Sequence, residues 1–246
     1  GWAHGVMNTD NMSILGITLD YGPFGFIDDY DPGFICNHSD HNGRYAFNQQ
    51  PYIGLWNLSC LAQALLPLAE KDALKAALDS YTPLCERRYM ELMQAKAGLS
   101  QEQEDDAALI QDLLGLMQQS HVDYTNCFRA LGAFSSAEGS LNESLRDHFL
   151  DREAFSAWAR RYAERLRREQ SHDGERRARM NRINPKYVLR NYLAQTAIEK
   201  AQQKDYSEVD RLLALLQDPY SEQPGMDAYA AAPPNWGKHL SVSCSS

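Results

Sequence analysis

Three side chains that carry oxygen ligands lie close together near the start of the chain: Asp10, Asn11 and Asp20. The apolar run Met12–Leu19 separates the last two and predicts a strand of about eight residues. A hairpin there would bring Asn11 and Asp20 together. One amide and one carboxylate, with water and substrate phosphates completing the ligand set, are typical of magnesium bound with a nucleotide and not of zinc. These residue types therefore predict a magnesium–nucleotide site.

Two short motifs around these residues match kinase-like phosphotransferases, in which a His-x-Asp-x-x-x-x-Asn loop and an Asp-Phe-Gly turn hold the metals. His4 stands seven residues before Asn11, and Asp20–Gly22 has the form of the turn. We expect His4 to order the loop through hydrogen bonds. Val6 occupies the position of the catalytic aspartate and cannot accept a proton from a hydroxyl. Asp10, next to Asn11, is the carboxylate available instead.

The segments that must position these side chains differ in character along the chain. Residues 1–50 are rich in Gly, Asn, Asp and aromatic residues, which predicts a loop-dominated region with short strands. From Pro51, apolar residues recur at three- and four-residue steps and predict an amphipathic helix of about 18 residues. These apolar positions are Leu55, Leu58, Ala62, Leu65 and Leu66.

Two further helices are predicted beyond residue 99. Ser100 followed by Gln103 has the form of a capping box and predicts that a helix begins there. Another helix is predicted after Asp151. The apolar positions expected on the buried faces of the two helices are Leu109, Leu113, Leu116 and Met117 in the first, and Phe155, Trp158, Tyr162 and Leu166 in the second.

Composition narrows the classes of function. The 246 residues carry a net charge of -9, which argues against broad binding to nucleic acid or to anionic membranes. Residues 151–190 are the exception, with 12 Lys and Arg against 6 Asp and Glu, and they predict either an anion-binding face or the solvated side of a helix. The first residues lack the order of a secretory signal and enter the motif region directly, so we expect a fragment of a longer protein.

Several stretches together resemble the selenoprotein O family of kinase-like proteins. They are HGVMNTDNMSILGITLDYGPFGFIDDYDPGFICNHSD, GRYAFNQQP, LWNLSCLAQAL, NPKYVLRNYLAQ and the C-terminal SCSS. The resemblance implies a mainly α fold, namely the C-terminal lobe of a protein-kinase-like fold with a short β-hairpin and a helical C-terminal extension. The implied boundaries are residues 1–95 for the lobe core with its catalytic and metal-binding loops, 96–225 for the helical extension and 226–246 for an extended, redox-active tail.

The same resemblance implies an activity. Family members transfer AMP from ATP to hydroxyl side chains of proteins and release pyrophosphate. By similarity, Asn11 and Asp20 bind Mg²⁺, with Mn²⁺ as a possible substitute, Asp20 also contacts the nucleotide, and Asp10 is the candidate general base. The implied partners are ATP, protein substrates with Ser, Thr or Tyr hydroxyls, and an N-terminal lobe that this sequence lacks. The fragment alone is expected to transfer little.

Cysteine usage predicts a reducing compartment, because five scattered cysteines do not form a disulfide scaffold in a chain of this length. Cys60 and Cys85 are expected to be buried thiols, whereas Cys244 lies in a polar tail where a thiol is open to oxidation. The resemblance implies that Cys36 and Cys244 form a redox pair. Two free thiols remain the alternative. The implied location is the bacterial cytoplasm, with mitochondrial relatives in eukaryotes.

Two other functions stay open from the residues alone. Val6 and the missing N-terminal lobe favour a non-catalytic pseudokinase or nucleotide-binding module. An ordinary phosphotransferase is a weaker third interpretation, because the usual catalytic aspartate is absent.

Overall fold

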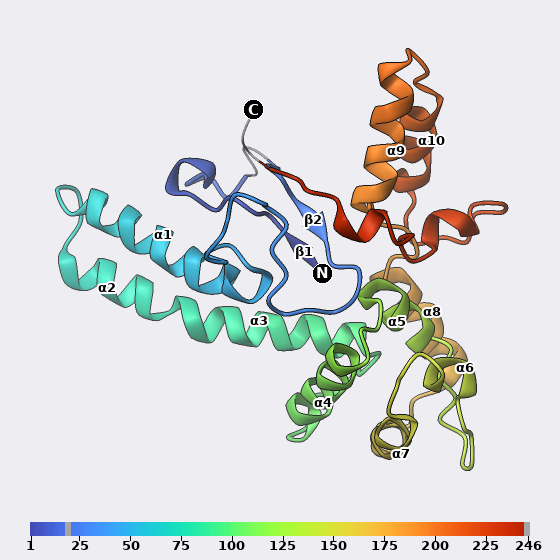
Figure 1. Cartoon of the computed structure of the whole chain (residues 1–246). Helices are drawn as coiled ribbons and strands as arrows, with labels where there is room; N and C mark the ends of the chain where they lie inside the picture. The colour runs from blue at the N-terminus through green and yellow to red at the C-terminus, as the bar shows by residue number, and fades with distance from the viewer. Residues whose placement is uncertain (18–20, 244–246) are drawn as a thin grey trace. The chain divides into compact units, whose positions relative to one another are not determined.

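The computed structural model describes residues 1–17 and 21–243 and is mainly helical (Figure 1). The chain divides into two compact units. The first comprises Gly1–Gly25, Pro32–Met90 and the C-terminal residues from Ser241, and the second comprises Phe26–Asp31 and Glu91–Leu240. No helix in the described ranges combines the length and the apolar character needed to cross a lipid bilayer.

The first unit contains a loop-rich N-terminal part followed by long helices. Its elements are β1 (Trp2–Ala3), the 3₁₀ helix η1 (Thr9–Asn11), the 3₁₀ helix η2 (Phe47–Gln49), α1 (Gln50–Leu65) and α2 (Lys71–Asp79). β1 pairs with β2 (Gly25–Phe26) in a two-stranded antiparallel sheet. The helix α3 (Tyr81–Lys96) begins in this unit and ends in the second.

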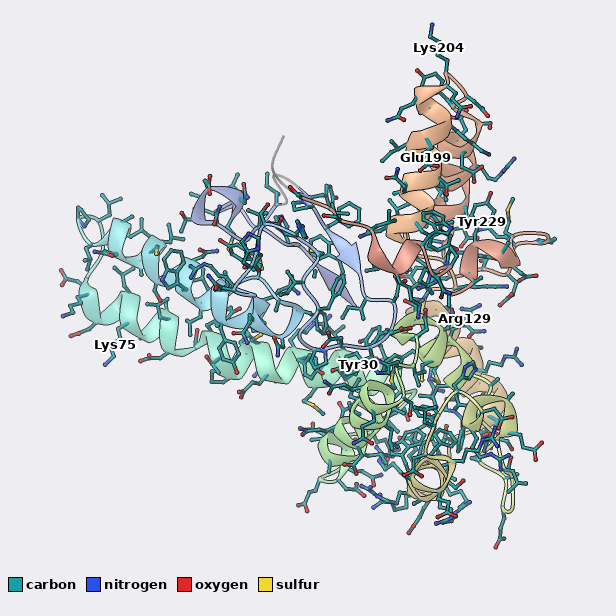
Figure 2. The ribbon with its side chains drawn as sticks, viewed as in Figure 1. Tyr30, Lys75, Arg129, Glu199, Lys204 and Tyr229 are labelled. Atoms are coloured by element: carbon teal, nitrogen blue, oxygen red, sulfur yellow. The ribbon has the colours of Figure 1, made fainter. Side chains whose placement is uncertain are left out.

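The second unit is built from helices. They are α4 (Asp106–Gln119), α5 (Tyr124–Leu131), α6 (Glu143–Arg146), α7 (Arg152–Arg168), α8 (Asp173–Ile183), α9 (Asn191–Gln202) and α10 (Ser207–Gln217), with short 3₁₀ helices η3 (Asp227–Ala230) and η4 (Gly237–His239). α4 packs against α7, and α9 packs against α10. Tyr229 of η3 donates a 2.6 Å hydrogen bond to Glu208 of α10, which holds this part of the chain against the α9–α10 pair (Figure 2).

Two of the predicted helices are confirmed. α1 begins one residue before Pro51, although the predicted apolar positions within it are only half-buried and Leu66, just beyond its end, is exposed. α7 begins after Asp151, whose side chain accepts a 2.8 Å hydrogen bond from the Ala154 N–H and so caps the helix. The four apolar residues predicted on its inner face, Phe155, Trp158, Tyr162 and Leu166, are all buried.

The predicted capping box at Ser100 is wrong. α4 begins only at Asp106, and the Ser100 N–H donates instead to the carboxylate of Glu169. The side chain of Asp106 accepts a 3.0 Å hydrogen bond from the Gln103 N–H. Residues 100–105 therefore form an irregular entry that buried carboxylates hold in place. The expected apolar face of α4 is nevertheless correct at Leu109, Leu113 and Met117, which are buried, whereas Leu116 is half-buried.

The continuous strand predicted over Met12–Leu19 is also wrong over residues 12–17, while residues 18 and 19 lie outside the described residues. The chain turns in the middle of this stretch, because the Gly16 N–H donates to the Ser13 carbonyl at 3.0 Å and Gly16 has a φ of +69°. Glycine adopts this left-handed backbone without steric cost, whereas other residues do not. Ile14 and Leu15, which suggested a strand by their apolar character, are largely exposed at the turn.

Candidate functional site

The loop His4–Asn11 is ordered by its own side chains. The Val6 N–H donates a 3.2 Å hydrogen bond to Nδ1 of His4, and the Asn11 side-chain amide donates to the Val6 carbonyl at 3.0 Å. His4 therefore orders the loop as predicted. Val6 is buried, so its side chain fills the core beneath the loop.

The two predicted functional residues of this loop keep their acceptor atoms available. Asn11 commits its amide nitrogen to Val6, which leaves Oδ1 as the acceptor on the half-buried side chain. Asp10 is exposed in η1, and no hydrogen bond or ion pair joins its carboxylate to any residue in the described ranges. This geometry suits an amide ligand for a cation beside a carboxylate that can take up a proton.

Asp20 lies outside the described residues, but the turn that follows it lies against the loop. Gly22 has a φ of +52°, and a Cβ added there would lie 3.4 Å from the His4 carbonyl oxygen. Gly22 therefore lies beside His4, the residue that orders the loop carrying Asn11. The donor set of one amide and one carboxylate oxygen fits magnesium. Residues 1–17 and 21–243 contain no cluster of three or more His, Cys, Asp or Glu side chains suited to a metal.

Cys36 lies directly behind the loop. Its thiol donates to the Ala3 carbonyl at 3.4 Å, and the neighbouring Asn37 amide donates to the Gly5 carbonyl at 3.2 Å. The approach is close enough that a Cβ on Gly5 would lie 2.6 Å from the Cys36 sulfur, and Gly5 also has a φ of +82°. Burial raises the pKa of the Cys36 thiol to about 11, so the thiol is protonated at neutral pH.

The C-terminal tail reaches the same segment. The His38 N–H donates to the Val242 carbonyl at 2.7 Å, and the hydroxyl of Ser39 bonds that of Ser243 at 3.4 Å. Cys244 itself lies outside the described residues. Cys36 carries a free thiol in this structure, as do the half-buried Cys60 and Cys85.

Sequence reasoning missed two polar residues of α1 that support the loop. The Gln50 side chain accepts from the His4 N–H at 3.0 Å and donates to the Trp2 carbonyl at 3.1 Å. Asn57 donates to the Met7 carbonyl at 2.9 Å and is buried, with its own Oδ1 lacking a protein partner in the described chain. The signal that could have identified Asn57 is its polar amide within the apolar run LWNLSCLAQAL.

Comparison with known proteins identifies the family of this chain. The family model "Protein adenylyltransferase SelO" matches residues 1–217. The chain is 60% identical over its whole length to "Protein nucleotidyltransferase YdiU" of Myxococcus xanthus (strain DK1622), of which it covers 50%. It is 56% identical to the protein of the same description from Pseudomonas fluorescens (strain Pf0-1), again covering all of this chain and 50% of the relative. The chain thus spans about half the length of the curated relatives it matches. With a family model covering most of its residues, this chain belongs to the SelO protein adenylyltransferase family.

Proposed function

We propose that this chain is the catalytic-loop half of a protein adenylyltransferase that moves AMP from ATP to Ser, Thr or Tyr hydroxyls of other proteins. The observation that carries the proposal is the loop His4–Asn11. It has a buried valine where a kinase needs a catalytic aspartate, and an exposed, unpaired carboxylate, Asp10, beside an amide whose oxygen is available. The family models and relatives support nucleotidyl transfer as the class of reaction.

The proposed role of each residue follows from its chemistry. Asn11 and Asp20 would hold Mg²⁺, which supplies positive charge to the triphosphate when bound. Asp10 accepts the proton of the attacking hydroxyl. The hydroxyl oxygen forms a bond to the α-phosphorus of ATP, the bond from that phosphorus to the bridging oxygen breaks, and pyrophosphate leaves with the electron pair.

This reaction is tested in a protein of the relatives' full length that contains this chain. The protein is incubated with a substrate protein and ATP labelled at either the α or the γ position. Retention of the α label on protein supports AMP transfer. Retention of the γ label indicates an ordinary phosphotransferase, and retention of neither indicates the nucleotide-binding module that Val6 also favours.

Asp20→Ala tests the metal assignment in the same protein. We expect magnesium-dependent binding of ATP to be lost, because one of the two proposed protein ligands is removed. Calorimetric titration with ATP, with and without Mg²⁺, measures the change. Asp29→Ala is the control, since Asp29 is an aspartate of the second unit that pairs with Lys238. Unchanged binding in Asp20→Ala contradicts the assignment.

We also propose redox control through Cys36 and Cys244. The support is the placement of the tail, because Val242 and Ser243 hydrogen-bond His38 and Ser39, immediately after Cys36. A disulfide between the two thiols would tie the tail to the segment behind the catalytic loop.

A further inference from the structure

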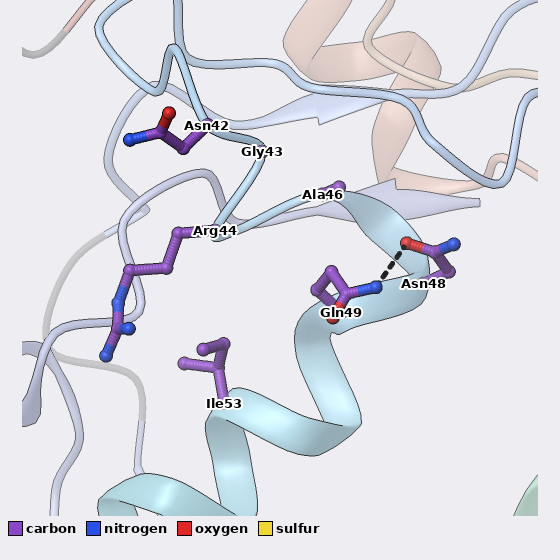
Figure 3. A pocket seen from close by; sticks show the side chains of 7 residues that line it. All are labelled: Asn42, Gly43, Arg44, Ala46, Asn48, Gln49 and Ile53. Atoms are coloured by element: carbon purple, nitrogen blue, oxygen red, sulfur yellow. Dashed lines mark hydrogen bonds between the residues drawn. The ribbon is translucent and has the colours of Figure 1, made fainter.

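A pocket of about 520 Å³ lies in the first unit, between the loop 42–46 and the beginning of α1. Arg44 from the loop and Ile53 from α1 border the same space (Figure 3). The side chains of Asn42, Asn48 and Gln49 supply amide groups at its edge, and Asn48 and Gln49 share a 3.3 Å hydrogen bond. The predicted nucleotide and metal residues are not among those that line it, so the pocket has no assigned occupant.

Arg44 packs against two aromatic side chains and forms no ion pair in the described chain. Its guanidinium carbon lies 4.7 Å from the ring centroid of Trp56 and 5.7 Å from that of Tyr45. The side chain is exposed, and no carboxylate in the described chain pairs with it. Exposed arginines such as Arg161 and Arg168, by contrast, each form an ion pair at 2.5 Å. The aromatic rings attract the guanidinium and leave its N–H groups free to donate.

The nearest acidic residue in the sequence is already used by the backbone. The two carboxylate oxygens of Asp40 accept from the N–H groups of Arg44 and Tyr45, at 2.9 and 2.7 Å. These bonds shape the loop that carries Arg44 and do not involve its guanidinium. The pocket therefore presents one cation, several amide donors and an apolar surface at Ile53.

This chemistry fits a carboxylate side chain better than a phosphate chain or a nucleobase. A planar guanidinium binds a carboxylate in bidentate fashion, and neighbouring amides can donate to the remaining lone pairs. A single cation matches a single negative charge. The faces of Trp56 and Tyr45 that contact Arg44 are not available for stacking on a base.

The loop that carries Arg44 and the helix α1 are both joined to the candidate catalytic loop by hydrogen bonds. The hydroxyl of Tyr45, next to Arg44, bonds the side chain of Asn8. Asn57, next to Trp56, bonds the Met7 carbonyl at 2.9 Å. We propose that Arg44 binds an aspartate or glutamate of the protein substrate, so that the enzyme selects hydroxyl residues within acidic segments. This inference rests on the proposed function for the identification of the bound peptide as a substrate. The binding of the peptide to Arg44 does not depend on that function.

Peptide binding to the 246-residue chain tests the pocket without ATP. A fluorescein-labelled peptide with a serine flanked by glutamates is compared, by fluorescence anisotropy, with the same peptide carrying glutamines. We expect the acidic peptide to bind more tightly, and Arg44→Ala to weaken it at least about fivefold while leaving the glutamine peptide unchanged. Arg160→Ala, at an exposed arginine of α7, is the matched control.

A charge-reversal variant distinguishes a specific loss of binding from a failure to fold. Arg44→Glu should prefer a peptide with lysines in place of the glutamates, a gain that unfolding does not produce. Equal affinities of wild type and Arg44→Ala for the acidic peptide overturn the proposal. Tighter binding of inorganic phosphate than of the acidic peptide, lost in Arg44→Ala, also overturns it and assigns the pocket to a phosphate.

The same variant separates this inference from the proposed reaction. In the protein of full length, Arg44→Ala should raise KM for an acidic substrate peptide and leave kcat unchanged, because it removes binding remote from the reacting atoms. If no AMP is transferred by wild type, the proposed function fails while the anisotropy result still stands. If AMP is transferred equally to acidic and glutamine peptides, the pocket assignment alone fails.

Discussion

Lys96 is a half-buried cation without an acidic partner in the described chain. Its ammonium donates a 2.9 Å hydrogen bond to Oδ1 of Asn184 and lies 4.7 Å from the ring centroid of Phe128 and 5.4 Å from that of Tyr124. The aromatic faces attract the charge but do not replace water, and burial lowers the pKa of Lys96 to about 8. The free energy of unfolding must therefore depend on pH through this residue.

The sign follows from proton binding. Between pH 8 and the ordinary lysine pKa of 10.5, the unfolded chain binds more protons than the folded chain, so Lys96 makes folding more favourable as pH rises. We expect the stability of wild type relative to Lys96→Met to increase across this window by at most about 1.4 kcal/mol per pH unit. Urea unfolding at pH 7.5, 8.5 and 9.5 measures the difference. Lys75→Met, at an exposed lysine of α2, should show no such trend. A flat difference for Lys96→Met would contradict the low pKa.

At the scale of elements, α7 is fastened to the start of α4 by a buried ion cluster. Arg165 contacts Asp106 at 2.5 Å and Glu169 at 2.9 Å, and all three side chains are almost completely buried. Glu169 also accepts from the Ser100 N–H, and Asp106 accepts from the Gln103 N–H. One arginine thus pairs with both of the carboxylates that hold the irregular entry to α4.

Removing this arginine should be costly. Arg165→Met leaves two uncompensated buried carboxylates, and we expect it to lower the free energy of unfolding by about 3–5 kcal/mol. Arg161→Met in the same helix breaks only the exposed pair with Asp112 and should cost less than about 1 kcal/mol. Chemical denaturation of the two variants, monitored by circular dichroism, gives both values. Similar losses for both would mean that the buried cluster does not stabilise this part of the chain.

The same cluster explains how far the sequence could predict the elements. Periodicity was enough to predict the helices α1 and α7, although the predicted apolar residues face the core only in α7 and are at most half-buried in α1. The start of α4 was not predictable in this way. Its position depends on Glu169, which is distant in the sequence and reaches Ser100 only in the folded chain. In Met12–Leu19, apolar residues suggested a strand, but Gly16 and the hydroxyl of Ser13 favour a turn.

In the candidate site, too, the residues with contacts that are local in sequence could be predicted, and those with long-range contacts could not. The types and spacing of His4 and Asn11 predicted an ordered loop, since their contacts are local in sequence. Gln50 and Asn57 escaped notice because their hydrogen bonds span more than forty residues, and Arg44 did so because its lack of an ionic partner is visible only in three dimensions.

At the scale of the whole molecule, the chain's last residues return to its beginning. The His38 N–H donates to the Val242 carbonyl, and the hydroxyl of Ser39 bonds that of Ser243, so the described end of the tail lies beside the segment that follows Cys36. The Cys36 thiol is a weak nucleophile at neutral pH. Burial raises the pKa of Cys36 to about 11, which makes its thiolate scarce at neutral pH. Attack on an oxidised partner should therefore start from the tail thiol and not from Cys36.

Oxidised glutathione tests this order in the 246-residue chain. A Cys244 thiolate attacks glutathione disulfide and releases one glutathione, and Cys36 then displaces the second to leave a Cys36–Cys244 disulfide. Mass spectrometry should find a loss of about 2 Da and a linked peptide pair in wild type and in the control Cys85→Ser. Cys36→Ser should stop at glutathionylated Cys244, whereas Cys244→Ser should leave Cys36 unmodified at neutral pH. Rapid glutathionylation of Cys36 in Cys244→Ser would contradict this order, and so would a disulfide that joins other cysteines. Either result would show that Cys244 is not the attacking thiol of a redox pair with Cys36.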